Sequence, residues 1–233
     1  MIELNRIETF YGKSQILFGV SLKIEDGQVV TLLGRNGMGK STTVRSIMGL
    51  TPIRSGRIVF EGTDIHNLSS YAIARLGIGL VPEGRQIFPN LTVYENMMAT
   101  AANRLGIKEP YTMAGVLSIF PRLGERMNHY GNQLSGGEQQ MLAVVRALMT
   151  NPKLLILDEA TEGLAPLTRK EIWNGLALLK KNGHSILVID KNLDALMNLA
   201  DRHCIMENGK VVWMGGTDAF SRDEALKTRY LGV

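Results

Sequence analysis

The sequence contains a single cysteine, Cys204, so it cannot form a disulfide framework. Small secreted domains held together by disulfides are therefore excluded, and a reducing compartment such as the cytoplasm is the expected setting. Cys204 lies within an apolar run at residues 202–206. We predict that it is a small buried hydrophobic residue rather than a reactive thiol.

Long hydrophobic runs and long basic runs are also missing from the sequence. No stretch approaches the ~18 uninterrupted apolar residues that a membrane-spanning helix needs, and the first six residues lack the pattern of a signal peptide. The net charge is +4, and the Lys and Arg residues are scattered. We therefore expect no nucleic-acid partner, and any link to a membrane must go through another protein.

Short apolar runs alternate with helical patterns along the 233 residues. Runs of this kind predict strands buried on both faces of a parallel sheet and joined by crossover helices. The predicted strands are 2–10, 16–24, 29–33, 56–60, 77–81, 154–157 and 185–189, and the predicted core helices are 41–49, 167–182 and one from about residue 223. An Asn-Gly pair at 208–209 predicts a hairpin.

The segment from about 92 to 150 has a different character and is predicted to be mostly helical. Breaks are expected at Pro110, Pro121 and Gly124. The sequence thus predicts one α/β domain, in which residues 1–83 and 151–233 form a core lobe and residues 84–150 form a helical lobe.

Residues 34–41 match the phosphate-binding pattern G-x-x-x-x-G-K-[ST], between a predicted buried strand and a predicted helix. Glycines let backbone N–H groups face phosphate oxygens, and the helix N-terminus adds its positive dipole end. Lys40 is predicted to reach the β- and γ-phosphates of ATP, and Ser41 to ligate Mg²⁺. The predicted nucleotide-binding residues of this segment are Gly34, Arg35, Asn36, Gly37, Met38, Gly39, Lys40, Ser41 and Thr42. The alternative is a glycine-rich turn that binds no nucleotide.

An acidic pair follows the predicted strand at 154–157. Asp158 then lies at the carboxyl end of a central strand, the edge at which open α/β sheets bind ligands, and it can hold Mg²⁺ directly or through water. Glu159 is predicted to orient and deprotonate the attacking water, which makes Glu159 and Lys40 the candidate catalytic residues. The alternative is an ordinary polar strand-to-loop transition.

Residues 134–140, Leu-Ser-Gly-Gly-Glu-Gln-Gln, precede a predicted helix. Ser135 and Glu138 can form a capping box, which alone would indicate only a well-capped helix. The adjacent glycines Gly136 and Gly137 are not explained by capping. They would leave an exposed helix N-terminus that a phosphate can approach.

The phosphate loop, the signature-like heptapeptide and the acidic pair eighteen residues after it together resemble ABC ATPases over essentially the whole chain. The resemblance implies a P-loop NTPase core with an N-terminal antiparallel β subdomain and a helical subdomain. It also implies a dimer, in which Ser135, Gly136, Gly137 and Glu138 contact the ATP held by the phosphate loop of the partner. Tyr11 matches the aromatic residue that stacks on adenine, and Glu83 stands where a glutamine near Mg²⁺ is usual.

Four positions depart from the general ABC pattern. Glu83 replaces glutamine, Ala160 replaces proline, Ala165 stands where an aspartate is usual, and Lys191 replaces a histidine. Most of these departures resemble the shorter ATP-binding subunit of branched-chain amino-acid importers, or of related urea and amide importers. Lys191 is hypothesised to contact the γ-phosphate as a point charge, and a solvated surface lysine is the alternative.

This resemblance implies a set of partners and a location. They are a second ATP-binding subunit in a homo- or heterodimer, integral membrane permeases and, indirectly, a periplasmic binding protein. The chain would lie on the cytoplasmic face of the inner membrane. ATP binding would close the dimer and move the permeases. Two other functions stay open: a soluble ABC-type ATPase, and a regulatory module that binds ATP but hydrolyses it poorly.

Overall fold

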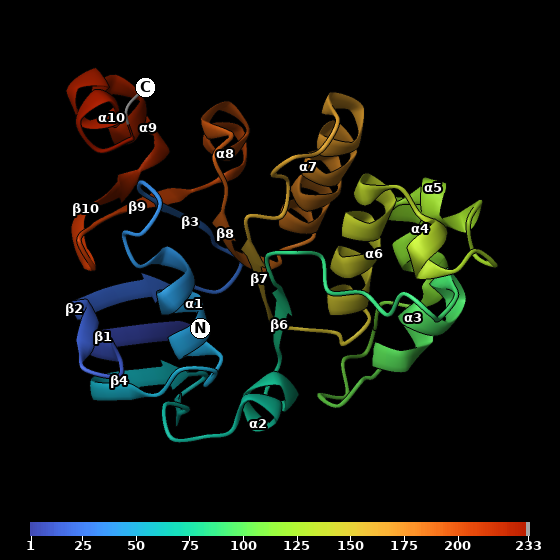
Figure 1. Cartoon of the computed structure of the whole chain (residues 1–233), viewed down its shortest axis with the longest axis horizontal. Coiled ribbons are helices and arrows are strands. Elements are labelled where there is room, and N and C mark those ends of the chain that lie inside the picture. The colour runs from blue at the N-terminus through green and yellow to red at the C-terminus, as the bar shows by residue number, and fades with distance from the viewer. Residues whose placement is uncertain (232–233) are drawn as a thin grey trace.

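The computed structural model describes residues 1–231, and Figure 1 shows the arrangement of its elements. The strands are β1 (Ile2–Tyr11), β2 (Ser14–Ile24), β3 (Val29–Leu33), β4 (Ile53–Phe60), β5 (Thr63–Asp64), β6 (Ile78–Val81), β7 (Leu154–Asp158), β8 (Ser185–Ile189), β9 (Arg202–Glu207) and β10 (Lys210–Gly216). The helices are α1 (Lys40–Ile47), α2 (Ser70–Arg75), α3 (Val93–Thr100), α4 (Met113–Ile119), α5 (Pro121–Gly124), the 3₁₀ helix η1 (Gly131–Gln133), α6 (Gly136–Leu148), α7 (Pro166–Lys181), α8 (Leu193–Leu199), α9 (Thr217–Arg222) and α10 (Glu224–Leu231).

Two sheets organise the core. The larger has the order β10-β9-β3-β8-β7-β6, and all its strand pairs are parallel except the β9–β10 hairpin. The smaller is antiparallel, with the order β2-β1-β4-β5. The predicted α/β fold with a parallel core and an N-terminal antiparallel β subdomain is confirmed. The hairpin turn at Asn208 and Gly209 has positive φ at both residues, as the Asn-Gly pair predicts.

The central strands are buried on both faces, so alternate residues enter two different hydrophobic clusters. In β7, Leu154 and Ile156 pack toward α1 and the antiparallel sheet, whereas Leu155 and Leu157 pack toward α6, α7 and α8. This is why the buried runs show no polar alternation in sequence. The carboxyl ends of β3, β7 and β8 meet at one edge, which brings residues far apart in sequence together.

The helices between residues 93 and 148 pack beside the sheet rather than forming a detached core. Val93, Val116 and Met141 belong to the same buried cluster as Leu155 and Val188 of the sheet. In Figure 1 they lie beyond β6 and β7, on the side away from the antiparallel sheet. The helical segment and the sheet therefore share one continuous apolar interior.

Several predicted boundaries need correction. The helical segment holds four short α-helices and a non-helical stretch over residues 101–112, so it is less helical than predicted. Pro121 begins a short helix instead of only breaking one, because a proline N–H is not needed in a first helical turn. The last helix, predicted from about residue 223, is confirmed as α10, and α9 before it was not predicted. The elements β5, α2 and α8 were not predicted.

Among residues 1–231, no helix combines the length and apolar character that a membrane crossing requires.

Candidate functional site

The predicted phosphate loop connects β3 to α1. Gly34 has φ 139°, and a Cβ on it would come within 2.4 Å of the Met206 carbonyl oxygen, so only glycine fits there. The Lys40 ammonium donates to the carbonyl oxygens of Gly34 (2.8 Å) and Arg35 (2.9 Å), folding back over the loop. Burial lowers the pKa of Lys40. The loop is thus a backbone cradle closed by one cation.

Ser41 and Asp158 bring an oxygen pair together beside this loop. The Ser41 hydroxyl donates to Oδ1 of Asp158 (3.2 Å), and the Asp158 residue is 6% exposed. Burial raises the pKa of Asp158, with a smaller contribution in the same direction from the charge of Glu83. A hydroxyl and a carboxylate are hard oxygen donors that fit Mg²⁺, an ion that takes only a few protein ligands and completes its shell with phosphate and water. No cluster of three His, Cys, Asp or Glu side chains suited to a metal occurs in residues 1–231.

Glu159 has a left-handed backbone with φ 51°, unusual for a residue with a side chain. Its N–H donates to the Ile189 carbonyl (2.9 Å), which holds the turn after β7 against the end of β8. The Glu162 carboxylate hydrogen-bonds Glu159 and, together with burial, raises the pKa of Glu159 to about 7, while Lys191 and Lys40 act in the opposite direction.

Lys191 extends from the end of β8 and pairs with the Glu162 carboxylate. This hydrogen bond raises the pKa of Lys191, and hydrogen bonds from Glu159 and Lys191 lower the pKa of Glu162. The structure therefore shows that Lys191 is paired within the chain and is not simply solvated. It leaves the predicted γ-phosphate contact untested.

The phosphate loop, Lys40, Glu159 and Lys191 line one cavity of about 440 Å³. It lies between the phosphate loop and the turns that follow β7 and β8. Its lining includes Gly34, Arg35, Asn36, Lys40, Glu159, Asp190 and Lys191. The phosphate loop and Lys40 form one wall, and Glu159 and Lys191 form the other. This arrangement suits a polyphosphate whose end faces Glu159.

Asp190 fixes the walls of this cavity, a role that sequence reasoning did not assign. Its Oδ2 accepts from the Thr161 N–H (3.1 Å) and hydroxyl (2.6 Å), and its Oδ1 accepts from the Asn192 N–H (2.9 Å). One side chain thus joins the turn after β7 to the turn after β8. Its position directly after a buried strand was the only available signal.

Tyr11 stands at the end of β1 and is 44% exposed. Burial raises the pKa of its hydroxyl, but hydrogen bonds to Thr42 and Thr51 and the nearby Arg45 outweigh it, so the net shift is downward. The Tyr11 side chain therefore lies near α1 and the residues after it, and part of the side chain stays accessible. That is compatible with a stacking surface, which stays a prediction.

The signature segment caps α6 as predicted. The Ser135 hydroxyl accepts from the Glu138 N–H, the Glu138 carboxylate accepts from the Ser135 N–H (2.8 Å), and Arg126 donates to the same carboxylate (3.2 Å). Glu138 is therefore buried and engaged within its own chain, whereas Ser135 is exposed. The helix α6 packs on the opposite face of the larger sheet from α1, so these residues do not line the phosphate cavity of their own chain.

Glu83 is exposed just after β6, close enough to Asp158 for its charge to act there. Three residues in a row after it, Gly84, Arg85 and Gln86, have positive φ. Arg146 of α6 donates to the Gln86 carbonyl (2.6 Å), and buried Asn96 of α3 bonds both the N–H and the carbonyl of Phe88 (2.9 Å each). This strained segment is thereby pinned to the helices.

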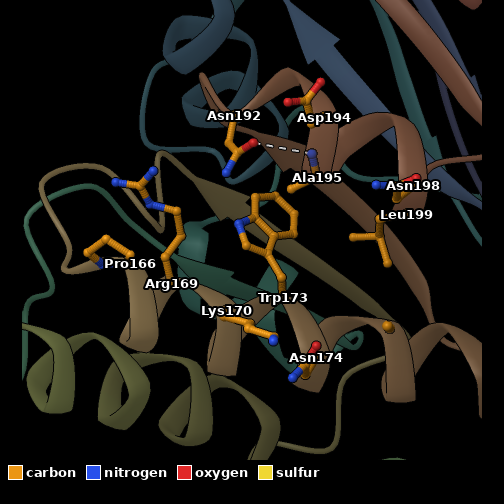
Figure 2. Close-up of a pocket in the computed structure, with 11 residues that line it drawn as sticks. Pro166, Arg169, Lys170, Trp173, Asn174, Asn192, Asp194, Ala195, Asn198 and Leu199 are labelled. Carbon is orange, nitrogen blue, oxygen red and sulfur yellow. Dashed lines mark hydrogen bonds between the residues drawn. The ribbon is translucent and has the colours of Figure 1, made fainter.

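A second cavity of about 490 Å³ lies between α7 and α8, and Figure 2 shows Trp173 standing between Arg169 and the residues of α8. Nε1 of Trp173 and Nε of Arg169 have no hydrogen-bond partner, yet both atoms are covered by protein and a ligand in the cavity cannot reach them. Arg169 also donates to the Leu164 carbonyl (3.1 Å), and Asn192 accepts from the Ala195 N–H (3.2 Å). These residues brace the turns that carry Glu162 and Lys191.

Comparison with known proteins finds relatives that are ATP-binding proteins of transport systems. The family described as ABC transporter matches residues 17–162. The chain is 40% identical to the high-affinity branched-chain amino acid transport ATP-binding protein BraG of Pseudomonas aeruginosa, with all of both chains covered. It is 33% identical to the lipopolysaccharide export system ATP-binding protein LptB of Escherichia coli, over 95% of this chain and 93% of LptB.

Solved structures agree with these relatives. The ADP conformation of MJ1267, an ATP-binding cassette of an ABC transporter, superposes with a TM-score of 0.84 at 28% identity, covering 100% of this chain and 97% of that one. A dimeric post-hydrolysis state of the cassette MJ0796 with ADP and phosphate gives a TM-score of 0.79 at 26% identity, over 93% and 99% of the two chains.

Proposed function

We propose, on the premise that this chain belongs to the ABC transporter family, that it is the ATP-hydrolysing subunit that drives an importer of branched-chain amino acids. Membership of the family follows from the match over residues 17–162 and from 40% identity to BraG over the full length. The chain is therefore an ATP-binding subunit with ATP hydrolase activity.

One observation carries the catalytic proposal: the phosphate loop, the Ser41–Asp158 pair and Glu159 converge on one edge of the sheet. The loop amides and Lys40 bind the phosphates, and the ammonium exchanges its two carbonyl acceptors for phosphate oxygens. Glu159 holds the water in line with the terminal phosphorus and takes its proton. Mg²⁺, held by Ser41 and Asp158 and reached by Glu83, would neutralise charge on the phosphates.

The chain supplies only part of each catalytic site. Subunits of this family dimerise and work with membrane permeases. We propose that Ser135, Gly136 and Gly137 complete the site of the partner subunit, since they are placed away from the cavity of their own chain. The partner is a second copy or a different ATP-binding subunit, and Tyr11 stacks on the adenine of the chain's own ATP.

The permeases are proposed to dock where the helical segment meets the core. A cavity of about 320 Å³ lies there, beside Pro82, Arg85, Gln86, Arg104 and Arg146. The strained turn at 84–86 joins Glu83, near Asp158, to the helices of residues 84–150, which we take to be a lobe that moves as a unit. A docked permease would thus sense the catalytic edge through this turn, on the cytoplasmic face of the membrane.

The cargo proposal rests on BraG, whose name specifies branched-chain amino acids. Its identity of 40% exceeds the 33% to LptB of Escherichia coli. Cargo is selected by the permeases and a periplasmic binding protein, and this chain contacts neither the solute nor its path. Urea and amides are the alternative cargoes.

Glu159→Gln tests the catalytic proposal. Measured on the chain assembled with its permeases, the variant should bind ATP as the wild type does and lose at least ~100-fold in turnover, because the amide cannot take a proton. Unchanged turnover would remove Glu159 from the role of base. A wild type that binds ATP but turns it over poorly even with its permeases would instead support a regulatory module.

Uptake by cells lacking this gene tests the cargo. Radiolabelled leucine, isoleucine and valine should enter more slowly than in the parent strain, and urea should enter at the parental rate. Plasmid-borne wild type should restore uptake, and the Glu159→Gln variant should not. Loss of urea or amide uptake with normal leucine uptake would assign the other cargo.

A further inference from the structure

We propose that Glu162 is a positioning residue that competes with the terminal phosphate of ATP for the Lys191 ammonium, so that the Lys191–Glu162 ion pair acts as a latch that distinguishes ATP from ADP. This inference rests on the proposed function, because it assumes that ATP occupies the phosphate cavity. It concerns a step that neither the phosphate loop nor Glu159 accounts for: how the chain registers the third phosphate.

The two residues lie side by side because their strands are neighbours. Lys191 stands two residues after β8 and Glu162 four residues after β7, and these strands pair in parallel up to Asp158 and Ile189. The Lys191 ammonium bonds a Glu162 carboxylate oxygen. The two side chains are 55% and 47% exposed. Exposed ion pairs are held weakly against solvent and competing ions, so this pair is exchangeable.

The Lys191 ammonium can also reach the phosphate cavity. Lys191 lines the 440 Å³ cavity together with the phosphate loop and Lys40. A terminal phosphate carries more negative charge than one carboxylate and would sit deeper, where charges are less screened. Lysine is suited to such an exchange, because its compact charge sits on a flexible four-carbon stem. ADP, which lacks that phosphate, leaves Lys191 on Glu162.

The backbone on both sides of the pair is fixed, so only side chains need to move. Asp190 joins Thr161 to Asn192 through three hydrogen bonds, and Asn192 caps α8. Arg169 donates to the carbonyl of Leu164, two residues after Glu162. The Glu162 N–H also donates to the Glu159 carbonyl (3.5 Å), so the latch adjoins the residue proposed to act on water.

A double-mutant cycle on the isolated full-length chain tests this inference. Affinities for ADP and for the non-hydrolysable ATP analogue AMP-PNP are measured by calorimetry with Mg²⁺ present. Lys191→Met should weaken AMP-PNP binding about 10-fold and leave ADP binding within about 2-fold. Glu162→Gln should do the opposite, tightening AMP-PNP binding about 3-fold or more without changing ADP binding, because the competitor for Lys191 is gone.

The double variant, with Lys191→Met and Glu162→Gln together, completes the double-mutant cycle. In the Lys191→Met background, Glu162→Gln should no longer change the affinity for AMP-PNP. The single variant Lys191→Arg keeps the positive charge and should retain most of the wild-type preference for AMP-PNP over ADP. Lys181→Met is the matched control: it removes an exposed lysine from the far end of α7 and should leave both affinities unchanged.

Three results would overturn the latch. The first is that Glu162→Gln binds AMP-PNP more weakly than the wild type or equally well. The second is that Glu162→Gln changes AMP-PNP affinity by the same factor with Lys191 and with Met at position 191. The third is that Lys191→Met weakens the binding of ADP and AMP-PNP equally. If the wild type hydrolyses ATP normally and any of these is seen, the latch fails and the proposed function stands. A wild type that binds neither nucleotide would overturn both.

Discussion

Among single residues, His203 shows how a buried polar group is kept neutral. The ring is fully buried in β9, stacked on Phe220 with ring centroids 4.6 Å apart. The Thr217 hydroxyl donates to the Ala200 carbonyl, so it accepts from Nε2–H of His203, and Nδ1 then accepts from Thr31. Both ring nitrogens are satisfied in this neutral tautomer.

We predict that His203 makes the fold acid-sensitive. Burial lowers its pKa from 6.5 to about 4. Between these values the unfolded chain binds the proton and the folded chain does not. Stability from this residue is therefore complete above pH 6.5 and is lost as the pH falls to 4. The loss corresponds to about 3 kcal/mol of unfolding free energy. Urea unfolding across this pH range measures it.

The control for this prediction is His203→Gln, which removes the titrating group. The variant should be less stable overall but should lose less stability per pH unit between 6.5 and 4. The slope does not vanish, because burial also lowers the pKa of His184. An identical slope in wild type and variant would show that His203 does not govern the acid response.

Cys204 gives a second prediction for a single residue. It is fully buried, as the sequence predicts, and burial raises its pKa to about 12. The reactive thiolate is therefore absent from the folded chain. We expect no labelling by DTNB in native buffer and one thiol per chain in denaturant. Saturating ATP should slow labelling at partial denaturation, because it stabilises the folded state by mass action. Rapid native labelling would contradict this.

At the scale of elements, the helix α6 meets α7 through a close backbone approach that sequence reasoning missed. A Cβ on Gly137 would lie 2.4 Å from Cγ2 of Thr168, a buried residue near the start of α7. The three atoms nearest to a Cβ on Gly136 instead belong to the Arg85 guanidinium, the end of a long side chain whose contact to Gln139 is a long one (3.3 Å). The two glycines of the signature thus have different structural constraints.

We predict opposite effects of alanine at these neighbouring positions. Gly137→Ala should lower the unfolding free energy by about 1–3 kcal/mol through overpacking. Gly136→Ala should be neutral or raise stability by up to about 1 kcal/mol, because alanine favours the helix and Arg85 can move. Chemical unfolding monitors both variants.

The contact with Thr168 is tested by adding Thr168→Ala to Gly137→Ala. Removing the clashing methyl group should make the double variant more stable than the sum of the single costs. Strict additivity would mean that the Gly137 cost comes from another source.

Local patterns found the elements that carry chemistry, and they missed contacts between distant segments. The buried runs at 154–157 and 185–189 predicted β7 and β8, because full burial requires apolar residues on both strand faces. Glu162 and Asp190 each bond a residue 29 positions away in the sequence, Lys191 and Thr161. Asn96 of α3 bonds Phe88, which lies outside its own helix. Nothing local marks such residues, since an exposed glutamate and a buried asparagine have many other uses.

The motifs predicted which side chains form the site, but which of them contact one another could be seen only in the folded structure. Ser41 and Asp158 are 117 residues apart and meet within hydrogen-bond distance because β3, β8 and β7 are adjacent in the sheet. Lys191 is a different case, because its position was noticed but its partner was not. A lysine in place of the expected histidine gave no indication that Glu162 would hold it.

For the molecule as a whole, the α1 and α6 helices pack on opposite faces of the larger sheet. Figure 1 shows them on either side of β6 and β7. The exposed start of α6 is therefore free to meet another molecule, and in the proposed dimer it would contact the partner's ATP. We predict that Ser135→Asp abolishes turnover in the assembled transporter and leaves ATP affinity of the isolated chain unchanged, because its carboxylate repels the partner's phosphate and not the chain's own.

Ser135→Asn is the matched control, since asparagine and aspartate have similar shapes and both cap helices well. The asparagine variant should keep the fold and much more of the turnover than the aspartate variant, which isolates charge as the cause.

Analytical ultracentrifugation gives an independent measure if the partner is a second copy. ATP should then drive Glu159→Gln from its 25.7 kDa monomer to a dimer, and the added Ser135→Asp should prevent this. Equal turnover in Asp and Asn variants would mean that position 135 faces no phosphate, and the trans arrangement would have to be abandoned.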